Sequence, residues 1–159
     1  MFRIGQGIDV HRLVTERPLI LCGVAVPHSK GLLGHSDADV AVHAVMDAVL
    51  GALALGDIGQ WFPDTDEKWR AADSMKLLAH ILSSPQVAVW KLVNLDLTIL
   101  AEKPRLSPHM PEMRENLARA FACEIDRISI KATTTEKLGF CGREEGIAAQ
   151  AVILLKRNP

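Results

Sequence analysis

The sequence predicts an α+β protein, a single-domain sandwich of one mostly antiparallel or mixed β-sheet packed against α-helices. Segments with the two-residue period of strands are interleaved with Ala- and Leu-rich segments that suit buried helices. Long strand-like segments lie near both ends of the chain, where they could pair antiparallel. The 159 residues, 48% hydrophobic and 23% charged, are enough for one core. No repeat or linker interrupts residues 1–159, so we expect one domain.

Two strands are expected first. Residues 2–13 alternate loosely between apolar and polar side chains, which is typical of a strand. Residues 19–26 are largely apolar, and Pro27 would end that strand because proline lacks an amide donor.

A long buried helix is expected over residues 40–55, which are rich in Ala, Val and Leu. Ser36 or Asp37 could cap its start, because their side-chain oxygens accept hydrogen bonds from unpaired amides. The glycines of residues 56–59 would end it, followed by a loop over 62–66.

Expected helices and strands also alternate along the second half of the chain. A helix is expected from about residue 73 to 82, because Pro85 disfavours its continuation. Residues 92–100 alternate cleanly and predict a strand. A helix over residues 108–122 follows, with Ser107 as a possible cap and a proline tolerated in its first turn. The last two strands are expected over residues 127–133 and 147–156.

The charge balance argues against nucleic-acid and membrane partners. The chain has 18 basic and 19 acidic residues, a net charge of −1, and no block of like charges. No stretch of about 18 uncharged apolar residues predicts a spanning helix. Three cysteines (Cys22, Cys123 and Cys141) without metal-like spacing, and no signal-like start, are typical of a bacterial cytoplasmic protein with free thiols.

Three metal-capable side chains stand out. Asp9 and His11 are two apart on a predicted strand and therefore share a face, while His43 interrupts an apolar helical run. One interpretation is a zinc site with three protein ligands and an open fourth position, with Asp47 orienting an imidazole from behind. The alternative is that His43 is a core histidine whose ring is hydrogen-bonded by Asp47. Asp9 and His11 would then be ordinary polar residues near the end of a strand.

Two glycine-containing segments resemble phosphate sites to different degrees. Gly5 and Gly7 invite a dinucleotide-binding interpretation, but Val10 occupies the third glycine position and the segment is strand-like, so we reject it. Residues 131–143 combine three threonines, Glu136, cations and glycines after a strand. Such a loop can hold phosphate oxygens and a hard metal, although a solvated turn fits its composition equally well.

Six blocks of the chain together resemble the 2-C-methyl-D-erythritol 2,4-cyclodiphosphate synthase family of the non-mevalonate isoprenoid pathway. They are residues 5–11, 31–40, 43–48, 55–59 with 62–66, 101–106, and 131–140. Gln6 and Cys141 depart from the commonest family pattern, but neither has a catalytic role there. The resemblance implies cyclisation of 4-diphosphocytidyl-2-C-methyl-D-erythritol 2-phosphate, in which CMP leaves by intramolecular phosphoryl transfer, a lyase reaction.

The resemblance also implies the metal ligands and catalytic residues. Asp9, His11 and His43 match the ligands of one zinc ion per subunit, and Glu136 matches the ligand of a magnesium or manganese ion. His35 and Thr134 match positions that stabilise the transition state, and Ser36 would help to fix the attacking phosphate.

The other substrate contacts that the resemblance implies are divided by the part of the substrate that they would touch. Around the erythritol hydroxyls lie Asp57, Ile58, Gly59, Phe62, Pro63, Asp64, Thr65 and Asp66. Around cytidine and its phosphates lie Ala101, Glu102, Lys103, Pro104, Arg105, Leu106, Ser107, Thr133, Thr134, Thr135 and Glu136. The remainder is Asp9, Val10, His11, Phe140 and Arg143.

Family members are homotrimers with sites at subunit junctions. Their central apolar channel can take an isoprenoid diphosphate, for which Arg143 is the expected phosphate contact. Two rival functions use the same residues. A zinc-dependent phosphoester hydrolase would release CMP with a linear product, and a non-catalytic nucleotide or isoprenoid-diphosphate sensor would bind without turnover.

Overall fold

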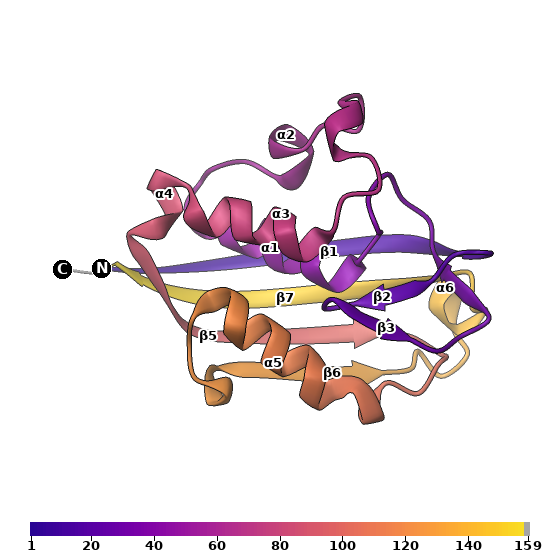
Figure 1. Ribbon diagram of the computed structural model, residues 1–159. Helices are drawn as coiled ribbons and strands as arrows, with labels where there is room; N and C mark the ends of the chain where they lie inside the picture. Colours follow the sequence, from indigo (N-terminus) through magenta and orange to yellow (C-terminus); the bar gives the residue numbers. More distant parts are fainter. Residues whose placement is uncertain (158–159) are drawn as a thin grey trace.

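The computed structural model describes residues 1–157, so the last two residues of the expected domain lie outside the described part. A five-stranded sheet has the order β4-β1-β7-β5-β6. Its neighbouring strands β1, β7, β5 and β6 lie side by side in Figure 1. Its strands β5 and β6 pair in parallel, and the other neighbours pair antiparallel. The bounds are β1 Phe2–Thr15, β4 Lys30–Leu32, β5 Trp90–Leu100, β6 Ile128–Thr133 and β7 Gly146–Arg157. The predicted antiparallel pairing of the two terminal strands is confirmed.

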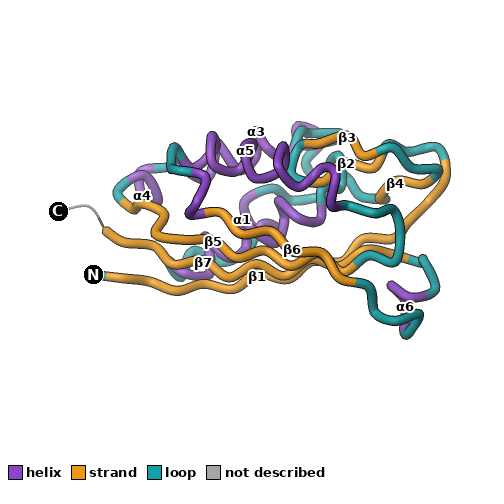
Figure 2. The backbone as a smooth tube through the Cα atoms, turned by 90° about the horizontal axis from the view of Figure 1, so that it is seen from below, coloured by secondary structure: helices purple, strands orange, loops and turns teal. Residues whose placement is uncertain are grey.

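Helices α1, α3 and α5 lie on one face of this sheet (Figure 2). The longer helices are α1 Val40–Ala52, α3 Ser74–Ser83 and α5 Met110–Phe121, with short helices α2 Ile58–Trp61, α4 Pro85–Ala88 and α6 Gly139–Gly142. Single 3-10 turns cover Glu67–Trp69, Ser107–His109 and Ile125–Arg127. The predicted α+β sandwich is confirmed. Among residues 1–157, no helix combines the length and apolarity needed to cross a bilayer.

The single strand expected over residues 19–26 is wrong. The segment forms a hairpin of β2 (Leu19–Leu21) and β3 (Val24–Val26), outside the main sheet. Cys22 and Gly23 turn the chain with φ values of 49° and 72°. Positive φ at both central residues is typical of a tight two-residue hairpin, which the apolar run concealed.

The expected helix caps also need correction. Asp39 caps α1, because its Oδ1 accepts from the Val42 amide at 3.1 Å, and the same carboxylate accepts from the Cys22 and Gly23 amides at 3.0 and 2.8 Å. It therefore fastens the hairpin to the helix. Ser107 does not cap α5 either, since it opens the preceding 3-10 turn and its hydroxyl accepts from Arg105.

The approach of α1 to β1 depends on two glycines that face the helix. A Cβ atom at Gly5 would lie 2.0 Å from the Ala48 carbonyl oxygen, and one at Gly7 would lie 2.0 Å from that of Ala44. No side chain fits such a gap, so glycine lets the helix backbone rest on the strand. This contact brings His43 on α1 towards Asp9 and His11 on β1.

The opposite face of β1 is apolar and exposed. Phe2, Ile4, Ile8 and Val10 are between 48% and 71% exposed. Val152 on β7 pairs directly with Gln6 and continues this exposed stripe, because paired residues of antiparallel strands point to the same face.

Candidate active site

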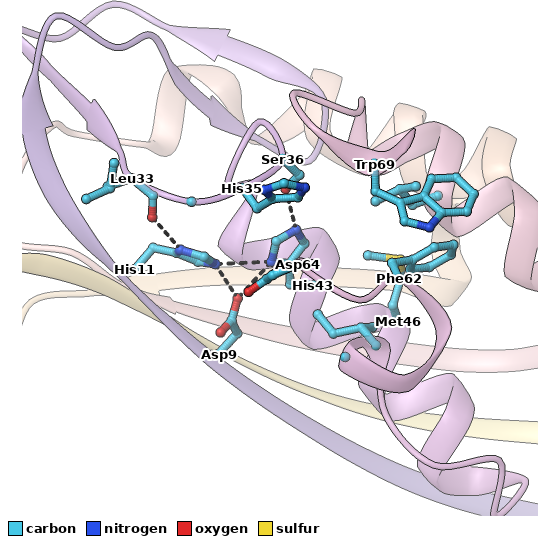
Figure 3. Close-up of a pocket in the computed structure, with 14 residues that line it drawn as sticks. Asp9, His11, Leu33, His35, Ser36, His43, Met46, Phe62, Asp64 and Trp69 are labelled. Carbon is cyan, nitrogen blue, oxygen red and sulfur yellow. Dashed lines mark hydrogen bonds and ion pairs between the residues drawn. The ribbon is translucent and has the colours of Figure 1, made fainter. Parts of the chain in front are cut away.

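Asp9, His11 and His43 converge on one point. The Oδ2 atom of Asp9 lies 2.8 Å from His11 Nε2 and 3.0 Å from His43 Nδ1, and the two ring nitrogens are 3.1 Å apart (Figure 3). The two residues of β1 share a face, as predicted, and His43 reaches them from α1. The three side chains form the candidate metal cluster of residues 1–157.

The outer nitrogens of both imidazoles have partners of their own. His11 Nδ1 lies 2.7 Å from the Leu33 carbonyl oxygen, which can only accept, so Nδ1 carries the proton. His43 Nε2 lies 3.1 Å from the hydroxyls of both Ser36 and Ser74. The inner nitrogens, His11 Nε2 and His43 Nδ1, both face the Asp9 carboxylate.

The electrostatics of the cluster favour a positive charge at its centre. Burial opposes ionisation of Asp9, but hydrogen bonds and charge from His11 and His43 outweigh it and hold the pKa of Asp9 well below its usual range. Burial alone would lower the pKa of His11, yet the hydrogen bond and charge of Asp9 raise it above its usual value.

The donor set fits zinc. Zinc in catalytic sites takes nitrogen and carboxylate oxygen ligands at about 2.0 Å, which places tetrahedral ligand atoms about 3.3 Å apart. The three separations, 2.8 to 3.1 Å, are slightly shorter, so small side-chain movements would accommodate the ion. An aspartate with two histidines and no fourth protein ligand matches catalytic rather than structural zinc sites.

The three cluster side chains themselves line part of a pocket of about 300 Å³. It takes in the expected His35 and Ser36, together with Ile58, Gly59, Phe62 and Asp64 from the region expected to surround erythritol. Its other lining residues are Leu33, Gly34, Met46, Trp69 and Leu77. Asp57, Pro63, Thr65 and Asp66 belong to the same loops without lining the pocket. Asp57 caps α2, and the Asp66 carbonyl oxygen lies 3.4 Å from His35 Nε2.

Most of the expected cytidine contacts line a different pocket, of about 480 Å³. Residues 101–107 form one wall, and Thr133 and Thr134 form another. The Thr134 hydroxyl lies 3.4 Å from the Glu136 carboxylate and accepts from the Glu136 amide at 3.3 Å. Within one chain, the expected catalytic pair of His35 and Thr134 is therefore divided between two pockets.

Some expected residues lie apart from both pockets. Val10 is 48% exposed on the far face of β1, so its side chain cannot reach a ligand at the metal cluster. Thr135, Glu136, Phe140 and Arg143 lie beyond β6, on the loop that includes α6, and the Arg143 guanidinium pairs with Glu145 at 3.0 Å.

The role expected for Asp47 is not what its contacts show. Asp47 Oδ1 accepts from the Ile58 amide at 2.8 Å, while the outer nitrogen of His43 contacts Ser36 and Ser74. Asp47 follows His43 by one helical turn, but its side chain turns towards the start of α2. It fixes a pocket wall instead of the imidazole.

Sequence reasoning missed several residues around the site. Arg17 donates to the carbonyl oxygens of Gly34 and Ser36 at 3.4 and 3.0 Å, and so braces the loop that carries His35. No local motif marks this arginine. Ser74 falls within the helix expected from about residue 73, and its sequence context does not mark it as part of the site. In the structure it is fully buried beside the helix of His43, where a polar side chain needs a partner. Trp69, against Phe62 in the pocket wall, had no signal either.

The YgbB family model matches residues 2–156. The chain belongs to the YgbB family. A family member of Geobacillus kaustophilus, named 2-C-methyl-D-erythritol 2,4-cyclodiphosphate synthase, is 59% identical over 158 residues, covering 99% of this chain and 100% of that protein. A protein of the same name from Geobacter metallireducens is 61% identical over 156 residues, covering 98% of this chain and 99% of its own length.

Solved structures agree with this family assignment. A CDP-bound 2C-methyl-D-erythritol-2,4-cyclodiphosphate synthase superposes with a TM-score of 0.88 at 40% identity, covering 97% of this chain and 100% of that one. The bifunctional IspDF of Campylobacter jejuni gives a TM-score of 0.94 at 42% identity, covering 99% of this chain and 43% of its own. The YgbB fold therefore extends over nearly the whole sequence.

Proposed function

We propose that this chain is a cyclodiphosphate synthase of the non-mevalonate isoprenoid pathway. It would convert 4-diphosphocytidyl-2-C-methyl-D-erythritol 2-phosphate to 2-C-methyl-D-erythritol 2,4-cyclodiphosphate, a phosphorus–oxygen lyase reaction. An oxygen of the 2-phosphate forms a bond to the β-phosphorus, the bond from that phosphorus to the CMP oxygen breaks, and CMP leaves. The observation that carries the proposal is the convergence of Asp9, His11 and His43 beside His35 and Ser36, in a chain of the YgbB family.

Asp9, His11 and His43 would hold one zinc ion, and Glu136 would hold magnesium or manganese. The metals would supply Lewis-acid polarisation of the phosphate oxygens. The cluster geometry supports zinc, since the inner nitrogens of both imidazoles and the Asp9 carboxylate lie close enough together to share one ion. Glu136 supplies a hard oxygen ligand of the kind that magnesium prefers.

The protein's own side chains would then bind and orient the substrate. The Ser36 hydroxyl, buried in the pocket wall, would donate to the attacking phosphate, and His35 and Thr134 would donate to the charge that develops on the transferred group. Residues 57–59 and 62–66 would surround the erythritol hydroxyls, and residues 101–107 and 133–136 would hold cytidine and its phosphates. No protein nucleophile is required, because the attacking group is part of the substrate.

Three copies of the chain would assemble with sites at their junctions. The separation of the two pockets within one chain supports this assembly, because a neighbouring copy would bring Thr134 to His35. The exposed apolar stripe on β1 and β7 supports it as well. An isoprenoid diphosphate in a central channel would have to compete with Glu145 for Arg143.

Phosphorus NMR of the purified protein with substrate, magnesium and a measured zinc content tests the proposal. Cyclic diphosphate signals should appear together with CMP. CMP with a linear product would instead establish the hydrolase, and binding without turnover by zinc-loaded protein would establish the sensor. Size-exclusion chromatography with light scattering tests the trimer separately.

A further inference from the structure

Two buried hydroxyls contact the outer nitrogen of His43, and their roles differ. Ser36 Oγ and Ser74 Oγ both lie 3.1 Å from His43 Nε2. Ser36 Oγ also accepts from the Ala38 amide at 3.1 Å, which leaves its own proton free. The Ser74 hydroxyl donates to Asp37 Oδ1 and has no second proton.

The position of the Ser74 proton determines the position of the His43 proton. Because Asp37 takes the only hydroxyl proton of Ser74, Ser74 Oγ can offer His43 lone pairs alone. His43 Nε2 must then carry a proton and donate it, which leaves Nδ1 unprotonated. Asp9 favours the other tautomer of His43. Its Oδ2 lies 3.0 Å from His43 Nδ1 and by itself would favour a proton on that nitrogen.

We propose that Asp37 and Ser74 are positioning residues that keep His43 in the tautomer able to bind metal. This Asp37–Ser74–His43 relay rests on the metal centre proposed above. It supplies the outer hydrogen bond that a metal-binding imidazole requires, with a hydroxyl inserted between carboxylate and ring.

Burial and anchoring support the relay. Ser74 is fully buried and His43 is 8% exposed, and within residues 1–157 the other hydrogen-bond contact of His43 Nε2 is the rotatable hydroxyl of Ser36. Asp37 is fixed by two more hydrogen bonds, because Oδ2 accepts from the Ser74 amide at 3.0 Å and Oδ1 accepts from the Asp39 amide at 3.1 Å. The carboxylate cannot turn away without losing both.

The test compares zinc binding by the native protein, Ser74→Ala and Asp37→Asn, using competition with a chromophoric chelator. We expect both variants to bind zinc roughly 10- to 100-fold more weakly, the usual effect of removing such a partner. Ser83→Ala is the matched control, because Ser83 lies at the end of the same helix and its hydroxyl contacts only the His80 carbonyl. It should bind zinc like the native protein.

A second measurement reads the tautomer directly. Long-range proton–nitrogen NMR of the metal-free protein, at a pH where both imidazoles are neutral, should show His43 protonated on Nε2 alone. In Ser74→Ala we expect a shift towards Nδ1 protonation, because Ser36 can serve either tautomer and Asp9 favours Nδ1. A purely structural serine would not change this signal.

The outcomes separate this inference from the proposed function. We expect Ser74→Ala to bind zinc roughly 10- to 100-fold more weakly than the native protein. The relay is wrong if the native protein binds zinc, and folded Ser74→Ala has a zinc affinity within about threefold of the native value and keeps the Nε2 tautomer of His43. If native protein binds no zinc, the metal centre itself is wrong. If Ser74→Ala does not fold, zinc affinity and the His43 tautomer are measured in Asp37→Asn instead, and the same two results test the relay.

Discussion

At the residue scale, the candidate site depends on where protons lie on two imidazoles. The Leu33 carbonyl orders one ring and the Ser74 hydroxyl orders the other, so the inner nitrogen of each ring can offer a lone pair to an ion held together with Asp9. The sequence shows that His11 and His43 are capable of binding metal, but the backbone carbonyl and the serine that order them are visible only in the fold.

His11→Ala should lose zinc and keep the fold. The substitution removes one of three proposed ligands from a partly buried strand position that lies outside the apolar core. We expect zinc affinity to fall by more than the roughly 100-fold cost of losing a supporting partner. Metal analysis beside circular dichroism measures both, with His109→Ala as the control because His109 lines neither pocket. One zinc per chain retained in His11→Ala would contradict the assignment.

Zinc affinity should depend on pH through His11. Its pKa is raised by Asp9, and zinc binds only the neutral ring. The protonated pair with Asp9 stabilises the metal-free fold at low pH, and this contribution is lost as the pH rises through the raised pKa. The zinc affinity should therefore be independent of pH above the pKa of His11. Below that pKa, it should fall by up to about tenfold for each pH unit. Chelator competition across weakly acidic to neutral pH measures this, and a flat profile would exclude His11 as a ligand.

Thr134→Ala should lower kcat while leaving substrate affinity nearly unchanged. Its hydroxyl is expected to donate to charge that develops only in the transition state, so its loss should cost about 2–4 kcal/mol, or roughly 30- to 1,000-fold in rate. Single-turnover kinetics separates binding from chemistry. Thr15→Ala, at the exposed end of β1, is the control. An unchanged turnover number would remove Thr134 from the mechanism.

At the element scale, the pairing of β1 with α1 builds the metal cluster. Both elements were predicted with nearly correct limits, β1 from a loose apolar–polar alternation and α1 from a segment rich in Ala, Val and Leu. The hairpin at residues 19–26 was missed, because an apolar run hides a turn that rests on positive φ at Cys22 and Gly23. The start of α1 was placed at the wrong cap, because several side chains in that loop have the chemistry of a cap and only tertiary contacts select Asp39.

Gly7→Ala should destabilise the fold and disturb the cluster together. The new methyl group would meet the Ala44 carbonyl, so the helix that carries His43 would have to move. We expect a loss of about 1–3 kcal/mol or more in the free energy of unfolding, with weaker zinc binding. Denaturant unfolding with zinc titration measures both effects.

The matched control for Gly7→Ala is Gly51→Ala, a glycine-to-alanine substitution on α1, the helix that packs against Gly7. A Cβ atom there would lie 3.6 Å from the Gln6 carbonyl oxygen, an ordinary contact. The change should be neutral or stabilising by about 0.5–1 kcal/mol, because alanine favours helices. Equal behaviour of the two variants would mean that α1 does not depend on close approach at Gly7.

At the scale of the whole molecule, the two pockets predict complementation between chains. If a site combines the metal cluster of one chain with the Thr134 pocket of another, mixed trimers of His11→Ala and Thr134→Ala contain some junctions with both halves intact. Random mixing of equal amounts should restore about a quarter of native activity. Activity after co-refolding, against each variant refolded alone, measures this. No gain on mixing would mean that both halves of a site come from one chain.

The sequence by itself determined the class of fold, most strands and helices, and the candidate ligands, because periodicity and side-chain chemistry are local properties. Only the tertiary structure decided that His43 meets Asp9 and His11, that Ser74 and not Asp47 orders its ring, and that His35 and Thr134 lie in different pockets. These are contacts between residues tens of positions apart. Which such residues meet depends on how close the helices approach the sheet, and that is set by packing across the whole core.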